Sequence, residues 1–134
     1  MLYENGAIVK SNVEDQPDIE MVNKYDQSGK LIYSGPYRNQ VPVSIHRDYG
    51  PDGKVINSKI YDDNGVLQSE GIVDDAGNRN GKWKDFYPSG KIQAEGQYID
   101  NRRSGLWKFY NEFEKGEQTG YFNNGRPDGI WKWY

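Results

Sequence analysis

The sequence predicts an all-β protein, an elongated single-layer antiparallel sheet of stacked β-hairpin repeats with a period of about 24 residues. The first observation is a G-x-W-K-x-aromatic block whose tryptophans, Trp83, Trp107 and Trp131, stand at steps of 107 − 83 = 24 and 131 − 107 = 24. The second is an interleaved turn-and-strand block, aromatic-x-x-x-G-[KV]-[LI]-x-x-x-G-x-[YV]. A fixed period of this length is typical of a repeat array, which we expect over residues 25–134.

Each copy of the second block begins with a turn and continues as a strand. The turns combine Asp, Asn, Ser or Pro with Gly, residues that cap a turn, preset φ or supply a positive φ. In the stretch that follows one turn, Ile92, Ala94, Gly96 and Tyr98 share one face, which is the alternation of a half-buried strand. The copies start at Tyr25, Tyr49, Tyr61, Phe86 and Tyr110.

Glycine recurs in the middle of these strands, at positions 35, 71, 96 and 120. Glycine weakens a strand interior, so its recurrence predicts that an aromatic ring lies across each of these positions. The repeat spacing also assigns Ser44 and His46 to the Gly and Trp places of a worn block. We therefore expect buried rings at Trp83 and Trp107 and a structural substitute for tryptophan at His46.

Residues 1–24 form a separate N-terminal acidic segment in this interpretation, and a worn repeat is one explanation of it. Residues 2–9 read as a worn turn and strand, whereas residues 11–20 are acidic, contain no basic residue, and read as an insertion loop or a linker. The stretch from Glu14 to Glu20 is a candidate protein contact, although a solvated loop is the stronger interpretation.

The C-terminal stretch from Gly129 to Tyr134 is a candidate partner-binding edge. Lys132 is its only charge, and an open, apolar sheet edge invites pairing with another strand. The candidate contact residues are Ile130, Trp131, Trp133 and Tyr134. The expected occupant is a second copy of the chain, a further repeat of a longer parent, or a partner protein.

The sequence favours neither catalysis nor a cofactor or metal site. It has no cysteine, and its single histidine, His46, occupies a repeat position. The acidic pairs Asp62-Asp63 and Asp74-Asp75 fall in turns, where aspartate is common for backbone reasons. No glycine precedes a helix that would hold a phosphate, and no run of about 18 apolar residues predicts a membrane helix.

The net charge of −3 is uneven, with −6 in residues 1–76 (7 basic, 13 acidic) and +3 in residues 77–134 (10 basic, 7 acidic). A basic stripe with aromatic residues is one signature of single-strand nucleic-acid binding. The lysines of the Trp blocks read more simply as solvated sheet positions, so nucleic-acid binding is not expected. The stripe would consist of Lys84, Arg102, Arg103, Lys108 and Lys132.

The two blocks, G-x-W-K-x-[FY] and Y-x-x-x-G-K-[LI]-x-x-x-G-x-Y, resemble the MORN-repeat variant of bacterial proteins, many of which are labelled YwqK-type antitoxins. The resemblance covers about residues 25–134, is clearest over 81–134, and is weakest over 37–60. It implies stacked hairpins, no enzyme activity from the repeats, no cofactor, and a toxin as protein partner.

The sequence favours two classes of function. The first is a non-enzymatic protein-binding scaffold, of which an antitoxin or immunity protein is the narrower form, and the second is a cell-envelope structural repeat protein. An aromatic platform for glycans or lipid headgroups is a third. An antitoxin would be cytoplasmic, whereas a protein whose signal peptide was removed would be secreted or in the cell envelope.

Overall fold

The structure is a computed structural model that describes residues 2–3, 6–13, 16–113 and 116–133. Over these residues the chain forms strands and turns and no helix, and every strand pair is antiparallel. The all-β hairpin fold is therefore confirmed. The chain divides into two compact units, Met1–Val66 and Leu67–Tyr134.

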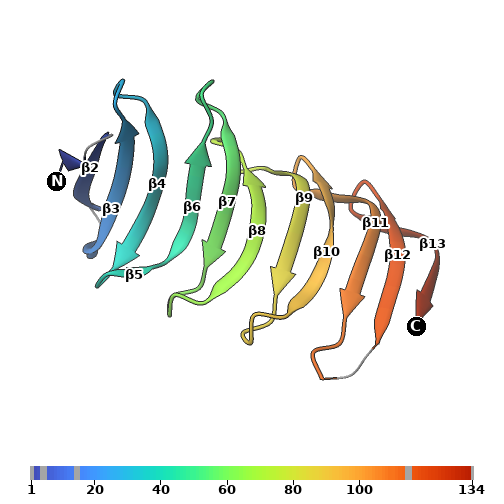
Figure 1. Ribbon diagram of the computed structural model, residues 1–134. Helices are drawn as coiled ribbons and strands as arrows, with labels where there is room; N and C mark the ends of the chain where they lie inside the picture. The colour runs from blue at the N-terminus through green and yellow to red at the C-terminus, as the bar shows by residue number, and fades with distance from the viewer. Residues whose placement is uncertain (1, 4–5, 14–15, 114–115, 134) are drawn as a thin grey trace. The chain divides into compact units, whose positions relative to one another are not determined.

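The N-terminal unit is an open antiparallel sheet whose strands lie side by side in chain order (Figure 1). Its neighbours run β1-β2-β3-β4-β6-β7, and the short β5 pairs with β4. The strands are β1 (Leu2–Tyr3), β2 (Gly6–Val13), β3 (Gln16–Asp26), β4 (Leu31–Arg38), β5 (Val41–Pro42), β6 (Ser44–Tyr49) and β7 (Val55–Tyr61).

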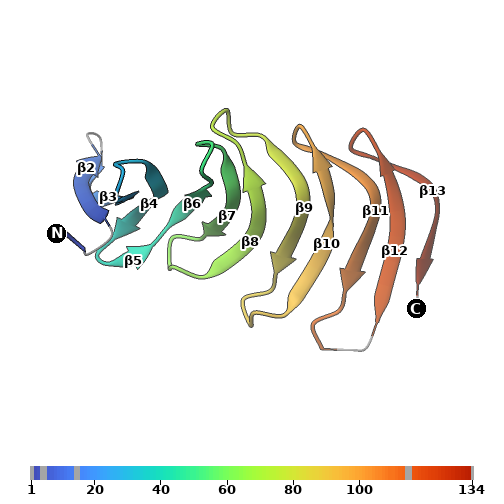
Figure 2. The same ribbon diagram turned by 45° about the horizontal axis from the view of Figure 1, so that its top comes forward.

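The C-terminal unit is also an open antiparallel sheet, and none of its described strands lies off the main path. Its strands pair strictly in chain order, and each is visibly curved (Figure 2). They are β8 (Leu67–Val73), β9 (Arg79–Phe86), β10 (Ile92–Ile99), β11 (Arg102–Tyr110), β12 (Glu117–Asn123) and β13 (Arg126–Trp133).

Two kinds of turn recur between the strands that the structure describes. In the first, a glycine N–H donates to the carbonyl three residues earlier, as Gly29 does to Asp26 and Gly65 to Asp62. In the second, two central residues both have positive φ, as in Asn124 (56°) and Gly125 (86°). The second geometry matches the twist of a tight hairpin, as the Asn-Gly pair predicts.

An aromatic ring lies over each of the four mid-strand glycines. A β-carbon added to any of these glycines would overlap ring atoms of the aromatic residue. Trp83 and Trp107 are only 1% and 0% exposed, so their expected burial is confirmed. The pairs are Gly35 with His46, Gly71 with Trp83, Gly96 with Trp107, and Gly120 with Trp131.

The expectation of a loop or linker over residues 11–20 is wrong for the residues that the structure describes. Residues 11–13 end β2 and residues 16–20 begin β3, while Glu14 and Asp15 lie outside the described residues. The strand forms because Ile19 and Val22 are buried and because the Asp18 carboxylate accepts a hydrogen bond from the Arg38 guanidinium at 2.9 Å. The domain boundary expected at residue 24 stays a prediction.

Replacing Trp107 with alanine should lower the free energy of unfolding by about 3–5 kcal/mol, the usual range for truncating a large buried aromatic side chain. Trp131→Ala should lower the free energy of unfolding by less, because Trp131 is half-buried whereas Trp107 is fully buried. Chemical denaturation followed by tryptophan fluorescence and circular dichroism measures both variants. Equal losses for the two would contradict this account of the packing.

Candidate functional site

His46 is held in a ring of tyrosines and backbone carbonyls. Its Nε2 atom lies 2.8 Å from the Pro36 carbonyl oxygen and 3.2 Å from that of Val43. Because carbonyls only accept hydrogen bonds, Nε2 carries the proton and Nδ1 accepts one from the Tyr33 hydroxyl. The Tyr37 hydroxyl then donates to Tyr33 at 2.9 Å.

This environment favours neutral His46, and both of its ring nitrogens are engaged in hydrogen bonds within the fold. Removal from water lowers the pKa of His46 below its ordinary value of 6.5, against the hydrogen bonds to the Pro36 and Val43 carbonyls, which raise it. Burial raises the pKa of the Tyr33 hydroxyl above its ordinary value. A base that activates a nucleophile needs a free nitrogen directed at it, so His46 acts here as the tryptophan substitute that the repeat predicts.

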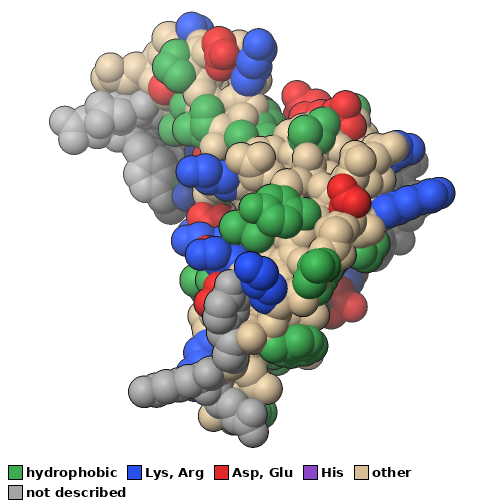
Figure 3. Space-filling model, turned by 90° about the vertical axis from the view of Figure 1, so that its right-hand side faces the viewer, with side chains coloured by type: hydrophobic (Ala, Val, Ile, Leu, Met, Phe, Trp, Pro, Cys, Tyr) green, Lys and Arg blue, Asp and Glu red, His purple; other side chains and the backbone are tan. Residues whose placement is uncertain are grey.

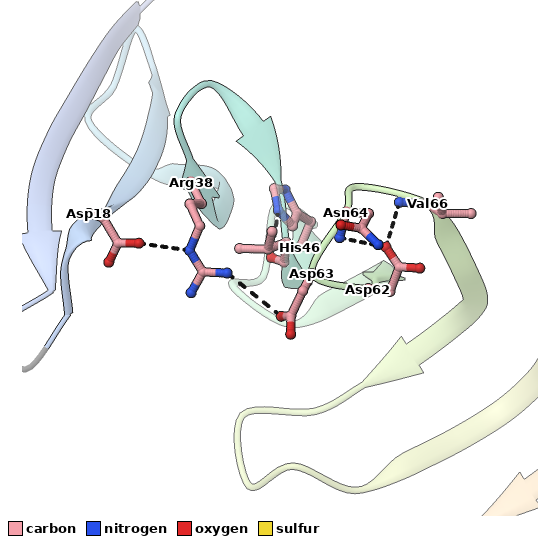
Figure 4. Close-up of polar contacts among 8 residues, drawn as sticks. Asp18, Arg38, His46, Asp62, Asp63, Asn64 and Val66 are labelled. Carbon is pink, nitrogen blue, oxygen red and sulfur yellow. Dashed lines mark hydrogen bonds and ion pairs between the residues drawn. The ribbon is translucent and has the colours of Figure 1, made fainter.

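Of the acidic pair Asp62-Asp63, the first residue accepts hydrogen bonds from its own turn and the second contacts Arg38 of β4 (Figure 4). The Asp62 carboxylate accepts hydrogen bonds from the N–H groups of Asn64 at 2.8 Å and Val66 at 2.9 Å. Arg38 lies between Asp18 and Asp63, whose Oδ1 atom is 3.8 Å from the guanidinium. Among the described residues, no group of three or more His, Asp or Glu side chains is placed to hold a metal ion.

The basic residues of the C-terminal unit lie on two different faces of the sheet. The Arg103 guanidinium lies 4.8 Å from the centre of the Trp107 ring, on the aromatic face, and Arg79 lies 4.7 Å from that of Trp83. The neighbouring Lys84 and Lys108 point to the other face, because successive strand residues alternate. Arg103 and the lysines therefore do not form one stripe.

On that other face, here called the outer face, charges of opposite sign alternate across the strands. Glu70 and Glu95 both stand opposite Lys84, and Glu95 also stands opposite Lys108. The alternation ends at β12, where Thr119 stands between Lys108 and Lys132. Opposite charges directly across a sheet stabilise it. Among the described strands, Lys132 has no acidic residue directly opposite it, whereas Lys84 and Lys108 do.

The predicted edge residues on β13 are divided between the two faces. Ile130 is 85% exposed on the outer face, and Trp133 is 77% exposed on the aromatic face. The centre of the Trp131 ring lies 5.6 Å from that of Phe109 and 5.1 Å from that of Phe122. Trp131 therefore contributes to packing within the sheet more than to contact with a partner. Tyr134 lies outside the described residues. Hydrophobic and basic side chains lie next to one another when the protein is viewed from the side of β13 (Figure 3).

A groove of about 330 Å³ lies on the outer face of β11, β12 and β13. Sequence reasoning missed it, although comparing outer-face positions one repeat apart reveals it. One repeat has the polar cross-strand pair Lys82 and Gln97 on its outer face. The next repeat has the apolar pair Leu106 and Tyr121 at the equivalent positions. The groove is lined by Leu106, Lys108, Glu117, Thr119, Gly120, Tyr121, Ile130 and Lys132.

The family model described as "MORN repeat variant" matches residues 22–39, 54–75 and 79–100. Over these three segments the chain is similar to MORN-variant repeats. The weakest part of the resemblance, residues 37–60, contains the unmatched stretch 40–53. Beyond residue 100, the rings of Trp107 and Trp131 keep the same placement over Gly96 and Gly120, so the repeat geometry continues past the matched segments.

No curated protein matches the chain in sequence. Among solved structures, the chain is similar to one described as the crystal structure of accessory secretory protein 1, 2 and 3 in Streptococcus pneumoniae, at 16% identity and a TM-score of 0.45. That similarity covers 91% of this chain and 20% of the other, so the protein spans about a fifth of its length. No helix long and apolar enough to cross a membrane occurs among the described residues.

The free energy of unfolding should fall as the pH drops from about 7.5 to about 5.5, in part through His46. Near and below pH 6.5 the unfolded chain binds a proton on this histidine more readily than the folded chain, because burial lowers the pKa of the folded ring. His46→Trp restores the repeat consensus and should be tolerated while removing this component. Chemical denaturation of both proteins at the two pH values measures it. An identical pH dependence would contradict the buried neutral His46.

Proposed function

We propose that this protein is a non-enzymatic repeat scaffold that binds another protein through its C-terminal surface, defined here as the outer-face groove together with the edge of β13. The observation that carries the proposal is the change from polar to apolar residues at equivalent outer positions. Lys82, Leu106 and Ile130 stand one repeat apart, and only the last two line the groove. Gln97 is likewise followed, one repeat on, by the 56% exposed Tyr121.

This surface has the composition of a protein contact. Contiguous exposed apolar side chains with a polar rim are typical of interaction sites, and Lys108, Glu117 and Lys132 supply such a rim. Lys108 and Glu117 also form a weak ion pair at 4.0 Å. A sheet edge beside such a groove offers backbone hydrogen bonds in addition to side-chain pockets.

The aromatic face supports binding indirectly, by making the sheet rigid. Trp107 contacts Gly96, Tyr98, Phe109 and Phe122, which ties three consecutive strands together beneath the groove. A preformed surface loses little conformational entropy when it binds. Because Trp83 and Trp107 are engaged in this packing, an aromatic platform for glycans or lipid headgroups is the weaker proposal.

An antitoxin or immunity protein is the narrower form of the same proposal, and its support is the resemblance to YwqK-type antitoxins. The partner in that case is a toxin, and the site of action is the cytoplasm. A cell-envelope structural role is the alternative, and a secretion signal in the full-length precursor would favour it.

The decisive variant is Leu106→Lys with Tyr121→Gln, because it installs the pair that the preceding repeat carries at Lys82 and Gln97. A protein captured by the wild-type chain is purified, and its affinity for each variant is measured by calorimetry. We expect a loss of at least about tenfold, corresponding to about 1.4 kcal/mol, with an unchanged melting temperature.

The matched control is Ile32→Lys with Ile56→Lys, two exposed apolar positions of the N-terminal unit. It should bind the captured protein as the wild type does. If the groove variant retained full affinity, or if the control lost as much, the C-terminal surface would not be the binding site.

A further inference from the structure

The strands of the C-terminal unit follow two pairing rules. On the aromatic face, a tryptophan stands opposite a glycine of the next strand, as Trp83 does to Gly96 and Trp107 to Gly120. On the outer face, the lysine that follows each of these tryptophans stands opposite a glutamate in at least one neighbouring strand. A strand that pairs with β13 by the same rules presents a glycine to Trp131 and an acid to Lys132.

Strand β13 carries both of these residues itself, placed symmetrically about Ile130. Gly129 and Trp131 are each one residue from Ile130, and Asp128 and Lys132 are each two residues from it. Among the described strands, β13 pairs with β12 alone. An antiparallel copy of β13 therefore satisfies both rules at once.

We propose that β13 pairs with β13 of a second copy of this chain, antiparallel and about a two-fold axis at Ile130. This inference rests on the proposed function, because it names the occupant of the edge that forms part of the C-terminal surface. In this register Lys132 faces Asp128 of the second copy on the outer face, and Trp131 faces Gly129 on the aromatic face. The two Ile130 side chains, each 85% exposed in the single chain, meet on the axis.

Charge and size select this register over its neighbours. An axis between two residues is excluded, because residues that stand opposite each other in an antiparallel pair point to the same face. An axis at Lys132 places two like charges opposite each other, which is destabilising. An axis at Trp131 places the two indoles opposite each other and Lys132 opposite Ile130, so both rules fail.

The backbone allows a short seam. In β11, regular pairing with the following strand begins at Gly105, whose equivalent in β13 is Gly129, and both have positive φ (71° and 73°). By this equivalence the regular backbone pairing covers about residues 129–131, with the side chains of Asp128 and Lys132 flanking it. Pro127 has no N–H to donate, so it keeps the seam short. Ile130 and Lys132 also line the groove, so the grooves of the two copies adjoin across the axis.

A charge exchange on the full chain tests the pairing. Lys132→Glu and Asp128→Lys each place like charges opposite each other twice per dimer, and should weaken dimerisation about tenfold in sedimentation equilibrium. The double variant Asp128→Lys with Lys132→Glu restores opposite charges and should restore the wild-type dissociation constant. Within the chain, Lys132 stands opposite Thr119 and Asp128 opposite Tyr121, so these changes break no ion pair among the described residues. Lys82→Glu, an exposed position opposite Gln97, is the control with the same change of charge.

A cysteine scan tests the register, since the chain has no cysteine of its own. Directly opposite residues of an antiparallel pair have α-carbons about 4.5–5.5 Å apart, within the range of a disulfide. Ile130→Cys should therefore form a covalent dimer under mild oxidation. Lys132→Cys should not, because its two copies lie about 14 Å apart in this register.

A monomer at every concentration, a double variant that fails to recover, or equal cross-linking through position 132 would overturn the inference. If that occurred while the Leu106→Lys, Tyr121→Gln variant still lost the captured protein, the proposed function would stand and only the second-copy pairing would fail. If the dimer formed as described while that groove variant kept full affinity for the captured protein, the second-copy pairing would stand and the proposed function would fail.

Discussion

An aromatic ring lying over a glycine of the preceding strand is the contact on which this structure depends. The ring occupies the place of a β-carbon, so at these positions glycine is required by space and not by φ. The contact explains how a chain that is only 34% hydrophobic builds a stable sheet. Each ring buries a large area and covers the neighbouring backbone, so few aliphatic side chains are needed. The edge-to-face contacts of Tyr98 with Trp83 and Trp107 join one such contact to the next.

Most of the fold was predictable from the sequence because the contact repeats with a fixed spacing. The register that relates Trp83 to Trp107 also identified His46, whose ring lies over Gly35 as the indoles lie over their glycines. The loop or linker expected over residues 11–20 was wrong for a physical reason. A solvated loop and a strand with exposed acids share one composition. Here the strand is decided by the burial of Ile19 and Val22 and by pairing with β4, from which Arg38 contacts Asp18 across 20 residues of sequence. Such a long-range pairing leaves no local signal.

The candidate site was only half predictable. An apolar C-terminal strand is visible in the sequence, and alternation divides its residues between two faces. Which residues of β12 these side chains meet depends on the pairing of the two strands, which includes an irregularity between Thr119 and Tyr121. The groove also depends on cross-strand register, since Leu106 and Tyr121 are 15 residues apart and meet only because their strands pair. Alternation within a single strand indicates which residues share a face. It does not indicate which residues of neighbouring strands stand opposite one another.

The consensus positions of the repeat specify the fold, whereas the departures from it distinguish one surface from another. In the last repeat, the acid at position 95 is replaced by Thr119, the Arg at position 103 by Pro127, and the polar pair at 82 and 97 by Leu106 and Tyr121. None of these changes affects the ring over its glycine, so each is compatible with the sheet. Three of them, Thr119, Leu106 and Tyr121, line the groove. A repeat protein gains specificity by such substitutions at outer positions, because these are free to vary while the aromatic face is constrained.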